Sequence, residues 1–133
     1  MVYALDTNVI IELLNNKSCA KSGLDAAVSR KIAIVVPPFV HYEIQRGFHY
    51  IKSPKKEAAY HNLISYCPIG SMTTQAFEIA AKIYADLRKA GKTIGDADIM
   101  IAAFCVVNKY NLVTANTKHF TDINDLPLVD WTK

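Results

Sequence analysis

Cysteine is scarce in this sequence, and its few copies follow no pattern typical of a metal site or a disulfide framework. The three residues, Cys19, Cys67 and Cys105, are odd in number and widely spaced. Such a set is typical of reduced thiols in an intracellular protein and argues against a zinc module or a small disulfide-stabilised domain. We therefore expect three free thiols without a catalytic role, in a cytoplasmic protein.

Long apolar runs and a strong excess of one charge are also absent. The apolar amino-terminal run is interrupted by Asp6 and Glu12 and has no basic segment before it, which predicts neither a signal peptide nor a membrane span. The net charge of +3 permits a nucleic-acid partner without requiring one. With 51% hydrophobic and 20% charged residues, the chain fits one folded domain over residues 1–133.

Short apolar segments alternate with amphipathic ones along the chain. Strands are expected at residues 2–5, 32–36, 112–114 and 128–130, with a short additional candidate at 67–69. Helices are expected after Asp6, at 24–31, after Pro37, at 54–66, from Thr73 or Thr74 to about 90, at 96–108 and near 118–120, whereas 15–23 is rich in turn-forming residues. This alternation predicts an α/β fold, with a parallel sheet of four or five strands flanked by helices and the first strand central.

Three acidic residues occupy positions where a folded core disfavours charge. Asp6 follows the first strand, Glu43 lies in the helix after the second strand, and Asp98 lies in an almost wholly apolar helix. A parallel sheet can bring these element ends to one edge, where open α/β proteins bind ligands. We therefore expect the three carboxylates to share a pocket.

A shared pocket of this kind needs a compensating positive charge. Two carboxylates about 4 Å apart repel by roughly 4 kcal/mol at an effective dielectric near 20. Arg46 could pair with Glu43 one helical turn away, but such a pair contributes only a few tenths of a kcal/mol. A divalent ion with a preference for oxygen ligands, Mg²⁺ or Mn²⁺, compensates the charge better.

Asp6 also has a purely structural explanation, and Asp98 has to be distinguished from its neighbour Asp96. Taken alone, Asp6 is more readily explained as a cap of the following helix or as the partner of a base. Thr7 and Asn8 are themselves good helix caps, and we also list them as residues that could support the site or contact substrate. Asp96 and Asp98 are two residues apart and cannot face the same way on a helix. Because Asp98 shares the buried face, we expect it in the pocket and place Asp96 at the helix start, as a cap or a support for the site.

Basic residues outside the acidic cluster are candidates for contacts with RNA. Residues 46–56, which include Arg46 and Lys52, are the most basic part of the chain and contain interleaved aromatic residues. They suit contacts with an RNA backbone, but a solvated helical face or a protein-docking surface explains them equally well. Lys118 and His119 lie nearer the expected pocket and could contact a phosphate. His119 is a poor candidate for a general base, since metal-bound water can supply the nucleophile.

Four ordered motifs give the chain a specific resemblance. They are Asp6-Thr7-Asn8 after the first strand, Glu43 after the second, KTIGDADIMIAA at residues 92–103 and LVTANTKHF at 112–120. In this combination, over nearly the whole chain, the sequence resembles the PIN-domain ribonucleases. More narrowly, it resembles the VapC-type toxins of bacterial toxin–antitoxin systems. This resemblance implies a PIN-like three-layer fold.

The resemblance also implies an activity and partners. The acids of the family that hold Mg²⁺ or Mn²⁺ correspond in position to Asp6, Glu43 and Asp98. The implied activity is that of an endoribonuclease in which metal-activated water cleaves structured RNA, such as a tRNA loop. The implied partners are a VapB-type antitoxin whose tail blocks the acidic pocket and a second copy of the chain in a homodimer.

The sequence departs from many PIN domains after the third expected strand. Aspartate is common at the position of Asn116, although many toxins of the subfamily also have asparagine there. Asn116 could orient a metal-bound water or could cap the next helical turn. Thr114 is either a hydroxyl of the pocket or an ordinary threonine at a strand end.

Two other classes of function are compatible with an acidic Mg²⁺ pocket in a small α/β protein. A phosphoacceptor receiver module is one, but it needs paired acids near the first strand, an aspartate after the third and a lysine after the fifth. A PIN scaffold that has lost activity and acts only as a binding partner is the other. Metal-dependent cleavage of RNA distinguishes both from an endoribonuclease.

Overall fold

Four parallel strands form the centre of the molecule. The computed structural model describes residues 1–132. The sheet has the order β2-β1-β3-β4, and its strands are β1 (Val2–Leu5), β2 (Ala33–Val35), β3 (Asn111–Val113) and β4 (Leu128–Val129). The expected α/β class, the parallel sheet and the internal position of the first strand are confirmed.

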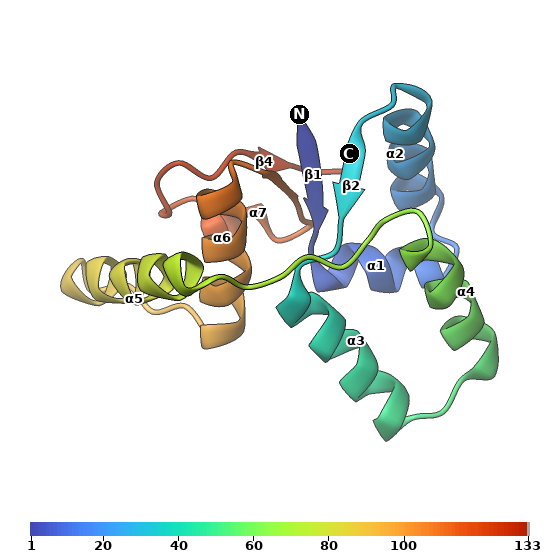
Figure 1. Cartoon of the computed structure of the whole chain (residues 1–133), viewed down its shortest axis with the longest axis horizontal. Helices are drawn as coiled ribbons and strands as arrows, with labels where there is room; N and C mark the ends of the chain where they lie inside the picture. Colours follow the sequence, from blue (N-terminus) through green and yellow to red (C-terminus); the bar gives the residue numbers. More distant parts are fainter. Residues whose placement is uncertain (133) are drawn as a thin grey trace.

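Helices flank the sheet on several sides. They are α1 (Thr7–Leu14), α2 (Ser18–Ser29), α3 (Pro38–Tyr50), α4 (Pro54–Ile64), α5 (Thr74–Lys89), α6 (Asp96–Asn108) and α7 (Thr117–Phe120). In Figure 1, α5 and α6 lie on the side of β4, α2 and α4 lie on the opposite side, and α1 and α3 start where β1 and β2 end. The start of α1 and the start of α3 are therefore both close to the carboxyl edge of the sheet.

The central strand is buried because both of its neighbours and its own apolar side chains shield it. Ala4 and Leu5 are completely buried. Tyr3 is paired with Ile34 of β2 on one side and with Asn111 of β3 on the other. This register brings the residues that follow β1 and β3 to the same edge of the sheet.

Helix α6 is buried over most of its surface, as its apolar sequence predicts. Small residues allow α5 to pack closely against it, since Ala80 of α5 lies in one buried cluster with Ile99 and Ala103 of α6. The helix ends at Lys109, which adopts the left-handed conformation that terminates helices, with φ of 59°. Helix α6 therefore holds a fixed position beside the sheet.

The structure differs from the expected elements in three places. Helix α2 begins at Ser18, inside the segment expected to form turns, because its buried face uses the small residue Ala20 together with Leu24 and Ala27. Strand β2 is shorter than expected, and its first residue is exposed because β2 is an edge strand. Residues 67–69 contribute one isolated bridge to Val36 and no strand, since Pro68 has no N–H to donate.

Two further expectations concern thiols and membranes. The three cysteines are free thiols, with Cys19 exposed and the other two buried. Over residues 1–132, no helix is both long enough and apolar enough to cross a membrane.

Candidate active site

Asp6 is a buried carboxylate at the carboxyl end of the central strand. Its side chain accepts hydrogen bonds from the Thr7 backbone N–H at 2.8 Å and from the Thr114 hydroxyl at 2.7 Å. Burial raises the pKa of Asp6 above its ordinary 3.8, these two hydrogen bonds lower it, and the charges of Asp98 and Glu43 raise it further, for a net increase. Asp6 therefore caps α1, as the structural explanation requires, and is also a destabilised anion beside two other acids.

Thr114 reaches Asp6 because β1 and β3 are paired in register. Leu5 pairs with Val113, and the Asp6 backbone N–H donates to the Val113 carbonyl at 2.9 Å, so the next residues on both strands are neighbours. Thr114 is completely buried, and its hydroxyl also accepts from the Asn116 backbone N–H at 3.0 Å. Thr114 is thus a strand-end residue whose hydroxyl contacts the Asp6 carboxylate.

Glu43 is connected to the same region through Thr7. The Thr7 hydroxyl donates to Glu43 Oε1 at 2.6 Å, which ties α3 to the start of α1. Arg46 Nη2 lies 3.6 Å from Glu43 Oε2, and the guanidinium of Arg46 also lies 5.2 Å from the centroid of the Tyr42 ring. The sequence-based pairing of Arg46 with Glu43 is thus present, although Arg46 was also expected as an RNA contact.

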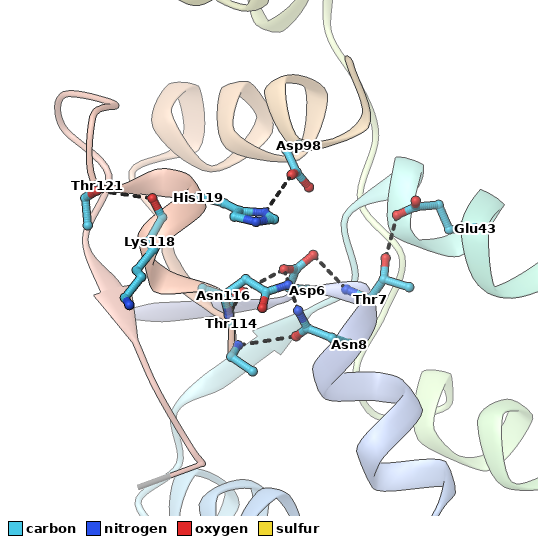
Figure 2. A network of polar contacts seen from close by, with 11 residues as sticks. Asp6, Thr7, Asn8, Glu43, Asp98, Thr114, Asn116, Lys118, His119 and Thr121 are labelled. Carbon is cyan, nitrogen blue, oxygen red and sulfur yellow. Dashed lines mark hydrogen bonds and ion pairs between the residues drawn. The ribbon is translucent and has the colours of Figure 1, made fainter. Parts of the chain in front are cut away.

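Asp98 lies in the first turn of α6 and faces His119. The Nδ1 atom of His119, which belongs to α7, lies 3.3 Å from Asp98 Oδ2. Figure 2 shows Asp98 and His119 directed toward one another, with Asp6 below them and Glu43 on the other side of Thr7. Asp96, the first residue of α6, is exposed. The two aspartates therefore have different surroundings, in the way that their spacing on a helix requires.

Four other predicted site residues are Asn8, Asn116, Lys52 and Lys118. The Asn8 side chain lies 3.4 Å from Asp6 Oδ2 and accepts from the Ala115 backbone N–H at 3.3 Å, which ties α1 to the loop after β3. Asn116 precedes α7, but its exposed side chain makes no capping hydrogen bond there. Lys52 lies between α3 and α4, and within residues 1–132 neither it nor Lys118 forms an ion pair with the acids.

The donor set fits a hard divalent cation. Asp6, Asp98 and Glu43 offer carboxylate oxygens, and the charges of Asp98 and Glu43 raise the pKa of Asp6. Within the described part of the chain, no three acidic, histidine or cysteine side chains are close enough to hold one ion together. Mg²⁺ commonly binds one or two carboxylates and keeps several waters, so this arrangement suits it better than an ion enclosed by protein ligands.

Three hollows are each lined by one of the acids. One of about 270 Å³ is lined by Asp98, His119, Lys118 and residues 92–95 together with two others. Another, of about 350 Å³, reaches Glu43 and has a largely apolar lining between α1, α3 and the loop after α3. A third, of about 460 Å³, is also lined by Glu43, together with Thr7, Arg46 and Tyr50. A hollow of about 430 Å³ between α5 and residues 122–125 contains none of the three acids. None of these four hollows is lined by more than one of the acids.

Sequence reasoning missed the interactions that join these residues. It predicted Thr7 as a helix cap or a support for the site and His119 as a phosphate contact, but it did not identify Glu43 and Asp98 as their partners. The available signal was their position, since Thr7 lies in the helix that follows β1 and His119 in the helix that follows β3. No local pattern identifies which acid each of them contacts.

Comparison with known proteins supports the resemblance seen in the motifs. The model of the PIN domain family matches residues 3–126. Ribonuclease VapC of Rickettsia bellii is 30% identical over 97% of this chain and 96% of its own. Ribonuclease VapC2 of Rickettsia felis is 28% identical over the full length of both chains.

Solved structures agree with these matches. The VapBC-1 structure from nontypeable Haemophilus influenzae contains a chain that is 28% identical, covers both chains completely and has a TM-score of 0.88. The VapBC2 structure from Rickettsia felis, bound to a DNA fragment from their promoter, contains a chain with a TM-score of 0.90 and 24% identity, over 98% of this chain and 99% of that one. The second match shows the fold alone. From the family match over most of its length and the full-length relatives, the chain belongs to the PIN domain family, in its VapC branch.

Proposed function

We propose that this protein is an endoribonuclease that depends on Mg²⁺ or Mn²⁺ and hydrolyses phosphodiester bonds in structured RNA. The observation that carries the proposal is the buried carboxylate of Asp6 at the carboxyl end of the central strand, with its pKa raised by burial and by the nearby charges of Asp98 and Glu43. The printed names of the relatives, Ribonuclease VapC and VapC2, support the class of reaction. Membership of the PIN family excludes the receiver module.

Asp6 and Asp98 would hold the metal ion, with Glu43 completing the negative charge of the site. When bound, the ion would neutralise the scissile phosphate and lower the pKa of water enough to supply the nucleophile. The chain itself fixes the geometry, because Thr114 and the Thr7 backbone N–H hold the two oxygens of Asp6. The buried carboxylate thus needs no rearrangement when substrate arrives.

Exposed cations on the rim would contact the RNA backbone. Lys118 lies on α7 beside the polar hollow that Asp98 lines, and Arg46 lies beside Glu43. Their side chains are exposed, so a phosphate can reach them without unfolding any element. Tight folding of the RNA, as in a tRNA loop, would present one phosphate to the acids and its neighbours to this rim.

A VapB-type antitoxin is the proposed partner. Two structures similar to this chain are titled VapBC2 and VapBC-1. The groove beside Glu43 has an apolar lining that includes the exposed side chains of Ile11 and Ile51, a surface that suits the apolar face of a partner helix. A homodimer is likewise proposed, and light scattering of the free protein measures it.

The test is cleavage of labelled RNA by the purified protein. Wild type should cut a tRNA pool in Mg²⁺ or Mn²⁺ and leave it intact in EDTA, while an unstructured RNA of matched composition is cut less. Asp6→Asn should be inactive, and Asp25→Asn, the same change at an exposed site on α2, should be as active as wild type. Cleavage that persists in EDTA contradicts the metal mechanism. A wild-type protein that cuts no RNA under any of these conditions is the inactive scaffold.

A further inference from the structure

Asp98 differs from the other two acids in how it is held. Asp6 accepts hydrogen bonds from both the backbone of Thr7 and the hydroxyl of Thr114, and Glu43 contacts the Thr7 hydroxyl and Arg46. Within residues 1–132, the side chain of Asp98 has one polar partner, Nδ1 of His119 at 3.3 Å. The orientation of its carboxylate therefore depends on a single contact.

The three acids share a common arrangement in spite of this difference. Each contacts a side chain outside its own element: Asp6 and Glu43 accept hydrogen bonds from Thr114 and Thr7, and Asp98 Oδ2 lies 3.3 Å from Nδ1 of His119. Thr114 directly follows β3, whereas Thr7 is the first residue of α1 and His119 belongs to α7 (Figure 2). Thr114 is completely buried and the Thr7 hydroxyl lies 2.6 Å from Glu43 Oε1, whereas the side chain of His119 lies at the surface.

The position of His119 is set by the elements around it. Helix α7 begins three residues after Thr114, and its Phe120 is buried in the main core, which anchors the turn. Helix α7 also packs against α6, which carries Asp98. The side chain of His119 is 59% exposed, so its ion pair with Asp98 adds little to the stability of the fold. A surface pair that stabilises little is better explained by an effect on the acid than by folding.

We propose that His119 is a positioning residue that orients the Asp98 carboxylate for the metal ion. The inference rests on the proposed function, and it concerns the protein before any RNA is bound. Groups that hydrogen-bond to metal-ligating side chains fix their orientation, and their loss typically lowers metal affinity or activity by about 10–100-fold. Asp98, with one such partner, is the acid most sensitive to that loss.

The chemistry of the contact specifies which replacements restore it. Donation from Nδ1 requires the proton on that nitrogen and leaves Nε2 free to face solvent or substrate. The side-chain nitrogen of asparagine lies where Nδ1 lies, whereas that of glutamine corresponds to Nε2. His119→Asn should therefore restore the contact with Asp98, and His119→Gln should not.

The experiment measures Mn²⁺ binding to the RNA-free protein by electron paramagnetic resonance, beside RNA cleavage as a function of Mn²⁺ concentration. His119→Ala should raise the Kd for Mn²⁺ by about 10–100-fold, and saturating Mn²⁺ should restore most of kcat. His119→Asn should bind Mn²⁺ nearly as wild type does, while His119→Gln should resemble the alanine variant. His61→Ala, an exposed histidine on α4, is the control and should match wild type.

The outcomes separate this inference from the function on which it rests. Wild type that binds Mn²⁺ and cleaves RNA, with Asp6→Asn deficient in both, supports the proposed function independently of His119. If His119→Ala then binds Mn²⁺ as wild type does, the inference is wrong, and a selective rise in KM for RNA would show that His119 contacts substrate instead. Equal behaviour of the asparagine and glutamine variants also overturns it. Wild type without Mn²⁺ binding overturns both proposals.

Discussion

Replacing Asp6 with asparagine should inactivate the protein and, without divalent ions, make its fold more stable. The side chain is 4% exposed, so its ionised form loses most of its hydration. The charges of Asp98 and Glu43 add repulsion. Asparagine has nearly the same shape and removes the charge, so both penalties disappear in one substitution.

The expected gain is a difference between opposing terms. Two unit charges about 4–15 Å apart at an effective dielectric near 20 repel by roughly 4 to 1 kcal/mol, and screening at the partly exposed Asp98 favours the low end of this range. Asparagine keeps one acceptor oxygen, so either the Thr7 N–H or the Thr114 hydroxyl loses a charged acceptor, at a cost of about 1 kcal/mol. With the relief of burial, the net gain is about 1 kcal/mol, or roughly 3–5 °C in Tm for a domain of this size.

The pH dependence gives the reasoning a sign that can be tested. Because the pKa of Asp6 is raised in the folded protein, the folded state holds this proton more tightly than the unfolded state does. The favourable contribution of the protonated group is complete below the ordinary 3.8 and is lost as pH rises through the higher folded pKa. The advantage of Asp6→Asn should therefore be small near pH 4 and reach its full size at neutral pH.

The assay is a set of thermal melts of both proteins in EDTA between pH 4 and 8, repeated with Mg²⁺. Mg²⁺ should raise the Tm of wild type by mass action and raise that of the variant much less. A variant that is less stable than wild type at pH 7.5 in EDTA, or a difference that does not change with pH, would refute the electrostatic argument. An Asp6→Asn protein that still cleaves RNA would remove the metal mechanism.

Two further predictions test the thiols and the packing of α2. Cys19 is exposed, whereas burial raises the pKa of the Cys67 and Cys105 thiols. A thiol reagent should therefore modify Cys19 alone in the native protein, which mass spectrometry checks. Replacing all three cysteines with alanine should leave RNA cleavage within a few-fold of wild type. Gly23→Ala would place a methyl group against the Trp131 ring and should destabilise the fold by about 1–3 kcal/mol. Gly47→Ala, in open space on α3, should not lower Tm.

The location of the acids could be predicted because it follows from strand topology. A carboxylate directly after a buried parallel strand must lie at the carboxyl edge, whatever the later packing. The position of Asp6 could therefore be predicted from the first six residues and the alternation of elements. The contact of Thr114 with Asp6 could not be predicted in this way, because it depends on the register that pairs Leu5 with Val113. Register is a property of the whole sheet and has no local signature.

The amino-terminal part of α2 shows a different limit of sequence reasoning. Hydrophobic periodicity detects a helix by large apolar side chains, and residues 18–23 have none. The buried face there is formed by Ala20, and Gly23 lies against Trp131 from the other end of the chain. Small residues allow this close approach, which is also why the segment resembles a turn in composition.

His119 is the residue for which sequence and structure lead to different experiments. From the sequence, a histidine beside a lysine near the pocket is a phosphate contact, and its replacement should weaken RNA binding alone. In the structure, its Nδ1 faces the only acid of the three that lacks a second polar partner within residues 1–132. Replacement should then weaken metal binding before RNA is present. Because α7 is anchored by Phe120 rather than by His119, the fold tolerates either variant, and the two interpretations remain separable by measurement.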